Sequence, residues 1–319
     1  MTQQIQKGLL FLTIISCCTK LFGQQIPDNP TSIQIFSPHV YNPAITGSKD
    51  FLNINFTARI EGRPKAQIIS GHARLLRPET DHLFSESGVT YSNFGVGGYI
   101  FNDQTGSFNN IGFSASGAYH LPLSRKAITF LSLGAAFNGT LSMPDNDAAD
   151  PGDENPGNTF YPNADLGVFF YNPRISAGFS ITNILGNLMQ VDSLKASSGL
   201  STAGFHFQVG YKIVLSRSQS IILEPSVYIN SIDSTSGQFY NDVNPTLKLY
   251  FKNFYIGTYY SSRDLLSYFM QYQFNRLYTG FFIEFPIEKL VNQSNIKIEL
   301  AIGMNLQNRK IQIRKNRFW

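Results

Sequence analysis

The feature that most constrains the fold of this chain is an alternation, with a period of two residues, between bulky apolar and small or polar side chains. In residues 51–60 the polar members are Asn53, Asn55, Thr57 and Arg59. The apolar members that alternate with them are Leu52, Ile54, Phe56, Ala58 and Ile60. Successive side chains of a strand point to opposite faces, so this pattern predicts a strand with one apolar face and one wet face.

The same alternation recurs in the longer segments 108–121, 203–215 and 296–306. Strands of about ten residues exceed the five or six that are usual in soluble sheets, and they match the length that a tilted strand needs to cross a bilayer. A charge that faces lipid at mid-membrane costs about 2–4 kcal/mol, so charges must lie on the wet face. The charged residues that follow this rule are Arg59, Lys212, Lys297 and Glu299.

Extended along the whole chain, the pattern predicts about fourteen strands, an even number as in bacterial outer-membrane barrels. Their predicted ranges are 51–60, 66–76, 95–102, 108–121, 127–141, 163–171, 174–182, 203–215, 220–230, 243–251, 254–261, 265–274, 277–285 and 296–306. Short connections follow the even-numbered strands and long ones follow the odd-numbered strands, except for the long stretch 77–94. Such barrels have short periplasmic turns and longer outer loops. We therefore predict an all-β fold, a transmembrane antiparallel up-and-down β-barrel in the outer membrane.

Composition favours the same class. Charged residues make up 14% of the chain, against about 25% in typical soluble domains. A barrel accounts for this, because one face of each strand meets lipid and carries no charge. The formal net charge is +4 and includes Lys7 and Lys20, which we expect to be removed, so no nucleic-acid partner is implied.

The N-terminus has the pattern of an export signal. Lys7 precedes the apolar stretch 8–16, which is too short to cross a bilayer as a helix and has the length of a signal-peptide core. We expect cleavage after Gly23; in the alternative, a lipoprotein cleavage box would leave a lipid on Cys17. Cleavage after Gly23 would remove both cysteines, Cys17 and Cys18, and with them disulfide and cysteine–metal chemistry.

These patterns divide the chain into four parts. Residues 1–23 are the predicted signal peptide, and 24–50 are an N-terminal arm rich in Asn, Pro and Ser. Residues 51–306 are the predicted barrel, and 307–319 are a basic C-terminal tail. The arm is expected either as a periplasmic contact or as a plug of the lumen, and the pattern does not favour one over the other.

No residue pattern indicates catalysis, a cofactor or a metal centre. The chain has five histidines but no G-x-S-x-G, phosphate-loop, H-E-x-x-H or CxxC motif. An outer-membrane lipase would need a Ser–His pair on the lipid face, whereas His120 and His206 lie on the wet phase of their strands. We interpret both as lumen residues that are held by their neighbours. The acidic segment 145–157 lacks the ligand spacing of an EF-hand, so we interpret it as a solvated outer loop.

A series of motifs points to a known family. An Asn-Pro-Ala-x-x-Gly-Ser segment at 42–48 lies just before the first predicted strand, and the motifs at 97–106, 118–124 and 160–171 follow in order. Their order and spacing resemble the PorP/SprF family of the type IX secretion system from about Gln24 to Leu306. The motif residues with a candidate structural or partner-binding role are Asn42, Pro43, Ala44, Gly47, Arg59, Gly62, Pro64 and Gln67.

The resemblance implies an outer-membrane component of protein secretion that binds and anchors, with no enzymatic activity and no cofactor. Its implied partners are type IX secretion components on the periplasmic side, a secreted surface protein such as an adhesin on the outer side, and outer-membrane lipid. In gliding bacteria the same component would serve motility. The alternative is a porin or a transporter of small or hydrophobic solutes, because a barrel of about fourteen strands is wide enough to pass them.

Overall fold

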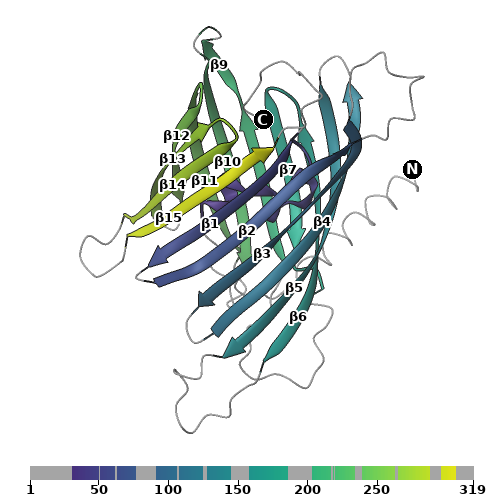
Figure 1. Ribbon diagram of the computed structural model, residues 1–319, viewed down its shortest axis with the longest axis vertical. Coiled ribbons are helices and arrows are strands. Elements are labelled where there is room, and N and C mark those ends of the chain that lie inside the picture. Colours follow the sequence, from purple (N-terminus) through teal and green to yellow (C-terminus); the bar gives the residue numbers. More distant parts are fainter. Residues whose placement is uncertain are drawn as a thin grey trace, which may run out of the picture.

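The computed structural model of the protein is a ring of strands around a lumen (Figure 1). It describes residues 31–49, 51–61, 63–76, 91–105, 108–124, 128–144, 158–185, 203–216, 218, 220–233, 239–262, 265–287 and 296–306. The strands are β1 (Leu52–Glu61), β2 (Arg63–Leu76), β3 (Tyr91–Thr105), β4 (Phe108–Ser124), β5 (Thr129–Pro144), β6 (Thr159–Tyr171), β7 (Ile175–Thr182), β8 (Gly204–Tyr211), β9 (Ile213–Ser216), β10 (Ile221–Asp233), β11 (Phe239–Phe251), β12 (Phe254–Ser261), β13 (Leu265–Phe274), β14 (Leu277–Pro286) and β15 (Lys297–Leu306). The predicted all-β antiparallel fold is confirmed.

The strands form one antiparallel sheet that closes on itself. Each strand pairs with its neighbours along the chain, and β1 also pairs with β15. β8 and β9 both pair with β10, on either side of Lys212, so they are two halves of a single strand in the wall. The described ring therefore has fourteen strands, as the alternation predicted. Closure satisfies the backbone groups that a sheet edge would expose to hydrocarbon.

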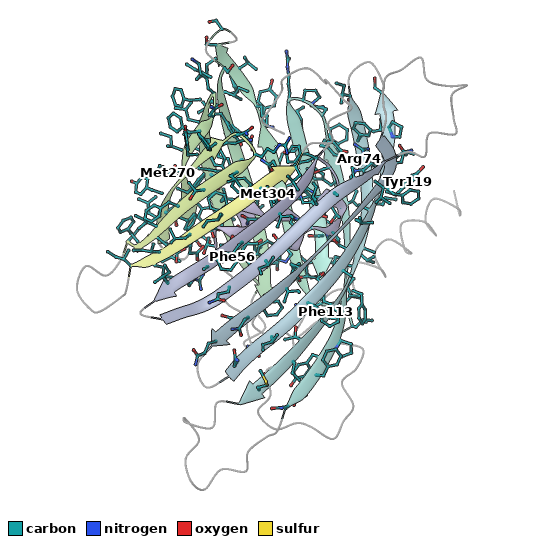
Figure 2. The ribbon with its side chains drawn as sticks, viewed as in Figure 1. Phe56, Arg74, Phe113, Tyr119, Met270 and Met304 are labelled. Atoms are coloured by element: carbon teal, nitrogen blue, oxygen red, sulfur yellow. The ribbon has the colours of Figure 1, made fainter. Side chains whose placement is uncertain are left out.

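The wall is apolar outside and polar inside. In β1 the side chain of Phe56 is 38% exposed, whereas Asn55 and Thr57 are fully buried. Figure 2 shows Phe56, Phe113 and Met270 on the outer side of the ring, where each is well exposed. This belt of outward apolar residues is the surface that the hydrocarbon of a bilayer requires.

The two ends of the barrel differ in their connections. One end, here called the short-turn end, carries tight connections at 172–174, 217–220, 252–253 and 275–276, although short connections also occur at the other end, at 62, 106–107 and 262–264. The other, called the long-connection end, is where residues 145–158, 183–203 and 287–296 link their strands. The exception that the sequence predicted remains, since residues 77–90 join β2 and β3 at the short-turn end.

Several strands run further than the alternation predicted. β3 begins at Tyr91, β6 at Thr159 and β11 at Phe239, each four residues before its predicted start. Ladder hydrogen bonds continue to the barrel rim, where lipid no longer requires an apolar residue at alternate positions. Hydrophobic alternation therefore marks the membrane-facing part of a strand and misses its ends.

The lumen contains an N-terminal arm, residues 31–49, which lies inside the ring of strands (Figure 1). The arm is built of three short pieces, α2 (Ile33–Phe36), η1 (Pro38–Val40) and η2 (Pro43–Ile45). In the described part of the chain, no helix is both long enough and apolar enough to cross a membrane. The core of the molecule is the interface between this arm and the inward-facing residues of the wall.

Candidate functional site

The arm packs into the lumen through three apolar clusters. The first consists of Ile35, Phe36, Tyr255, Tyr259, Phe269, Phe282 and Ala301, the second of Ile33, Val40, Ile68 and Phe101, and the third of Ala44, Ile45, Phe169 and Tyr171. Ile33 and Ala44 are completely buried, and Phe36 is 4% exposed. Burying a large apolar side chain contributes about 1.5–3 kcal/mol, so these clusters hold the arm firmly. They also fill part of the lumen with apolar side chains, in a space that would contain water if the wall stood alone.

A buried carboxylate fastens the start of the arm to the last described strand. Glu299 of β15 accepts hydrogen bonds from the backbone N–H of Thr31 at 3.1 Å and of Ser32 at 2.8 Å. The same carboxylate pairs with Arg59 of β1, whose Nε lies 2.9 Å from Oε1. The unpaired N–H groups at the start of a helix favour a negative charge, and Arg59 balances that charge. Arg59 and Glu299 therefore act together on the arm.

The Asn-Pro-Ala part of the motif forms η2 and its cap. Asn42 accepts a hydrogen bond from the backbone N–H of Ala44 at 2.9 Å, and Pro43 occupies the first position of the turn, where its missing N–H costs nothing. The side-chain amide of Asn42 donates to the carbonyl oxygens of Val168 at 3.2 Å and of Phe179 at 3.5 Å. One side chain thus shapes the arm and binds it to β6 and β7.

Glycines in the wall make room for this segment. A Cβ atom at Gly134 of β5 would clash with the backbone of Ala44, and one at Gly167 of β6 would clash with the side chain of Asn42. Only glycine allows the wall to approach the arm so closely. The motif in the arm and these wall glycines are therefore two halves of one contact.

The glycine of the motif lies where another residue would be strained. Gly47 has a φ of +75°, and its N–H donates to Nδ1 of His72 at 3.1 Å. The His72 ring packs on His39 of the arm, with ring centroids 4.6 Å apart. Burial, together with the nearby charge of Lys49, lowers the pKa of His39 to about 3. A neutral imidazole in this position adds no charge to the packed centre of the lumen.

His120 is bound on both of its ring nitrogens. Nε2 lies 2.9 Å from the carbonyl oxygen of Thr46 in the arm, and Nδ1 lies 3.1 Å from the hydroxyl of Tyr171. A carbonyl can only accept, so Nε2 carries the proton and Nδ1 accepts from Tyr171. His120 is a lumen residue held by its neighbours, as the sequence predicted, and it ties the end of the arm to the wall.

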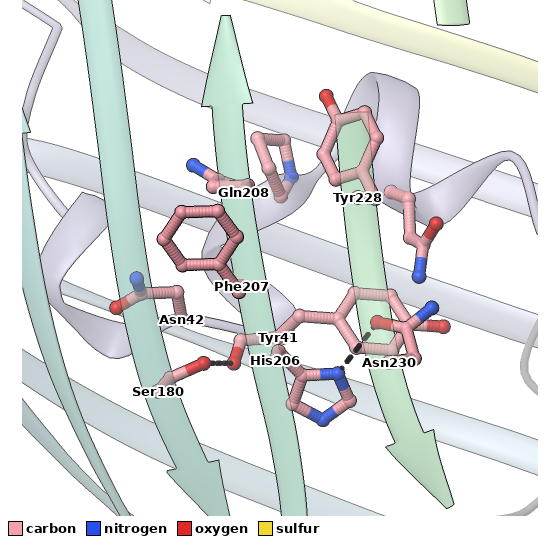
Figure 3. Close-up of a pocket in the computed structure, with 10 residues that line it drawn as sticks. Tyr41, Asn42, Ser180, His206, Phe207, Gln208, Tyr228 and Asn230 are labelled. Atoms are coloured by element: carbon pink, nitrogen blue, oxygen red, sulfur yellow. Dashed lines mark hydrogen bonds between the residues drawn. The ribbon is translucent and has the colours of Figure 1, made fainter. Parts of the chain in front are cut away.

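Figure 3 shows the seam between the arm and strands β7, β8 and β10. Ser180 donates to the carbonyl oxygen of Tyr41 at 2.7 Å. His206 lies beneath Tyr41 and is hydrogen-bonded to Asn230 at 2.8 Å and to Thr182 at 3.1 Å. The space that remains is about 10 Å³, which is no more than one water needs. This side of the arm is therefore closed against the wall.

A larger cavity remains at the short-turn end. Its volume is about 210 Å³, and it lies between the arm and residues near the short turns, including Arg174, Asn253 and Gln273. In the described residues, no group of three or more His, Cys, Asp or Glu side chains is placed to hold a metal ion. The predicted outer loop at 145–157 lies outside the described residues.

The structure brings some of the candidate motif residues together and separates others. Asn42, Pro43, Ala44 and Gly47 all lie in the arm, and Arg59 contacts the carboxylate that holds it. The remaining candidates lie elsewhere: Gln67 lies on the outward-facing phase of β2, Pro64 pairs with Ile60 in the β1–β2 ladder, and Gly62 is outside the described residues. Sequence reasoning missed Glu299 as an anchor and missed Gly134 and Gly167. The signal that could have found these two glycines was their position on the lumen phase of their strands, where the lack of a side chain leaves room for another segment.

Comparison with solved structures identifies outer-membrane barrels. A FadL homologue of Pseudomonas aeruginosa is 10% identical with a TM-score of 0.45 and covers 90% of this chain and 96% of its own. BamA from Haemophilus ducreyi lacking POTRA domains 1–3 is 10% identical with a TM-score of 0.43, over 80% of this chain and 70% of its own. Because these TM-scores are below 0.5, the fold rests on the strand pairing of this chain itself. No curated protein matches the chain.

A family model gives the more specific result. The model that describes the type IX secretion system membrane protein PorP/SprF matches residues 27–304, which include the arm and the whole ring of strands except the last two residues of β15. The resemblance to this family that the motifs indicated is thus confirmed by a family model that spans most of the chain. The protein belongs to the PorP/SprF family of type IX secretion system membrane proteins.

Proposed function

We propose that this outer-membrane barrel is a binding and anchoring component of the type IX secretion system. It holds components of the secretion apparatus on its periplasmic side and a secreted surface protein, such as an adhesin, on its outer side. In a gliding bacterium the same attachment would serve motility. Family membership supports a role in secretion. The chemistry required is binding at the two ends of the barrel.

The observation that carries this proposal is the packed arm. Three apolar clusters and the Glu299 anchor fix residues 31–49 across the lumen, so the barrel is built as a rigid body. A transporter would need a continuous path for its solute between the two ends. A filled barrel instead offers its two rims, each with its own connections, as surfaces for partners.

Orientation follows from the connections. In bacterial barrels the short turns face the periplasm and the longer loops face outward. The short-turn end would then meet the secretion apparatus, and the long-connection end would meet the secreted protein. This assignment predicts a different set of partners for each rim.

Site-specific crosslinking tests the proposal. A photo-crosslinking amino acid is placed at Arg276 on the short-turn end or at Asn158 on the long-connection end, since both positions are exposed. In living cells we expect Arg276 to capture periplasmic components of the apparatus and Asn158 to capture a secreted surface protein. Capture of the same partners at both ends, or of none at either end, would count against anchoring.

The transporter alternative is tested by conductance. The purified full-length protein is inserted into planar bilayers and the current is recorded. We expect no steady open-channel current, because the arm is buried in the lumen. A large, stable current from the intact protein would favour a porin and would show that the arm does not close the lumen.

A further inference from the structure

The cavity at the short-turn end has an unusual lining. Its floor is formed by the arm, through Phe36, Ile45 and Lys49, and its walls come from strands on several sides of the ring. Its volume of about 210 Å³ is far more than a small ion requires, since about 10–15 Å³ holds one water. It is therefore large enough for several side-chain or peptide groups at once.

Positive charge dominates this lining. Four bases, Lys49, Arg174, Lys212 and Lys248, surround the cavity together with a single carboxylate, Glu224. Glu224 lies 3.8 Å from the ammonium group of Lys212 and 3.6 Å from that of Lys248. One carboxylate cannot balance all four bases, so the described lining keeps a surplus of positive charge.

The bases are close enough to affect one another. The ammonium groups of Lys212 and Lys248 lie 3.8 Å and 3.6 Å from the same carboxylate, that of Glu224, so these two bases are near one another. Like charges that are withdrawn from bulk water repel more strongly than exposed ones. The backbone holds two of the bases together, because the N–H of Lys212 donates to the carbonyl oxygen of Arg174 at 2.7 Å. An anion that entered the cavity would relieve this repulsion.

The neutral part of the lining fits a peptide better than it fits a lone anion. Amide side chains can donate and accept hydrogen bonds at once, as a peptide backbone requires. The described lining includes seven of them: Asn53, Asn172, Gln208, Asn253, Gln271, Gln273 and Asn305. Tyrosine rings, including Tyr228 and Tyr250, provide flat surfaces for apolar groups between them.

We propose that this basic cavity binds a carboxylate-bearing peptide segment of a partner protein at the short-turn end of the barrel. The carboxylates lie among Lys49, Arg174, Lys212 and Lys248, and the peptide groups meet the amide side chains. The inference deepens the proposed function, on which the periplasmic location of the partner rests. The binding chemistry itself needs only the cavity.

A peptide titration tests the inference directly. The full-length protein is held in lipid nanodiscs, where both ends are open to solution, and is titrated with a fluorescent short peptide of alternating Asp and Tyr. A matched peptide has Asn in place of each Asp. We expect the acidic peptide to bind at least about tenfold more tightly than its amide counterpart, and to bind more weakly as salt is added. Equal binding of the two peptides would overturn the inference.

Variants localise the binding. Lys49→Gln combined with Arg174→Gln removes two bases that are not fully buried, and Lys252→Gln removes an exposed base at the same end that does not line the cavity. We expect the double variant to lose at least about tenfold in affinity and the Lys252 variant to stay within about twofold. Lys49→Arg with Arg174→Lys keeps both charges and should restore binding. Loss of binding in this charge-retaining variant would point to damaged structure and count against the inference.

A competitor separates peptide from small anion. Inorganic phosphate is added to the bound acidic peptide at equal concentration of charge. We expect little displacement, because phosphate cannot use the amide and tyrosine surfaces. Displacement by phosphate as effective as by unlabelled peptide would reassign the cavity to a small anion. Failure of the titration would leave the crosslinking pattern at the two rims unchanged, so the inference and the proposed function fail separately.

Discussion

The two ends of the lumen differ in how their buried charges are balanced. Near the long-connection end, the described side chains include the buried carboxylates of Asp103, Asp242, Glu284 and Glu299. Glu299 binds the start of the arm, and Glu284 accepts from the hydroxyl of Thr31 at 3.1 Å. At the short-turn end, four bases surround a cavity whose described lining includes a single carboxylate. One end has its charges satisfied inside the molecule, and the other has an excess.

This difference suggests that the charges at one end stabilise the fold, whereas those at the other end can bind a ligand. A buried charge with its partners in place fixes one arrangement of the chain, because removing any member leaves the others unpaired. A cluster of like charges around a cavity has the opposite property, since it becomes more stable when a ligand of opposite charge arrives. We therefore expect substitutions at the long-connection end to change stability, and substitutions at the short-turn end to change binding.

The largest effect is expected at Glu299. Glu299→Gln removes the charge that balances Arg59, whose side chain is 6% exposed, and weakens the acceptors for the start of the arm. We expect the free energy of unfolding to fall by about 3–5 kcal/mol, the usual cost of breaking a buried ion pair. Urea titration of the protein folded into lipid vesicles measures this change. The pair Arg59→Met with Glu299→Met leaves neither member of this ion pair buried without the other and should lose less; an unchanged midpoint for Glu299→Gln would show that the carboxylate does not hold the arm.

Overpacking the arm contact should have the next largest effect. Gly134→Ala places a methyl group against the backbone of Ala44, and we expect a cost of about 1–3 kcal/mol together with faster protease cleavage of the arm. Gly117→Ala is the matched control, since its Cβ would have its nearest neighbour, the carbonyl oxygen of Gly95, 3.9 Å away. Equal cleavage of the arm in both variants would mean that the close contact between Gly134 and η2 does not hold the arm in the lumen.

At the short-turn end the same kind of substitution should act differently. Glu224→Gln removes the one carboxylate among the bases of the cavity, and we expect a loss of about 2 kcal/mol at low salt, less than for Glu299→Gln. Added salt should recover part of this loss, because ions can enter the cavity and screen the bases. The variant should also bind the acidic peptide more tightly than the original protein. If the free energy of unfolding falls by the same amount at low and high salt, ions do not reach the bases of this cavity.

The smallest effect is expected at the edge of the arm. Thr31→Val removes the hydroxyl that donates to Glu284, while the Lys297 ammonium group remains 3.6 Å from the same carboxylate. We expect a loss of about 1 kcal/mol, measured by the same urea titration. Ser262→Ala serves as the control at this end, because Ser262 donates to Asp242 and does not touch the arm. Protease cleavage of the arm should rise for Thr31→Val and stay constant for Ser262→Ala.

The barrel could be predicted from the sequence because lipid imposes a local rule. Each strand must show an apolar residue at every second position, and this rule needs no knowledge of the neighbouring strand. The lumen phase of Arg59, Lys212, Lys297 and Glu299 followed from it and is confirmed. The pairing of Arg59 with Glu299 did not follow, because it depends on the ring closing between the first and last described strands.

The seating of the arm was beyond the reach of such rules. Its helical pieces are three or four residues long, too short to carry a hydrophobic period. The motif from Asn42 to Gly47 marked the segment but not its location, since its partners Gly134 and Gly167 lie on β5 and β6. A glycine has no side chain to contribute to a hydrophobic pattern, so the pattern cannot reveal a contact that depends on glycine. The choice between a periplasmic contact and a plug stays a prediction; the burial of Ile33 and Ala44 favours the plug for residues 31–49.

The position of Glu299 has a consequence for assembly. The arm precedes β1 and is synthesised before any strand, yet its latch belongs to β15, which is synthesised after all the others. The contact between Glu299 and the start of the arm therefore cannot form until β15 has docked beside β1. A barrel that stalls before this step lacks that contact and keeps a gap in its wall, so fastening the start of the arm and closing the ring occur together.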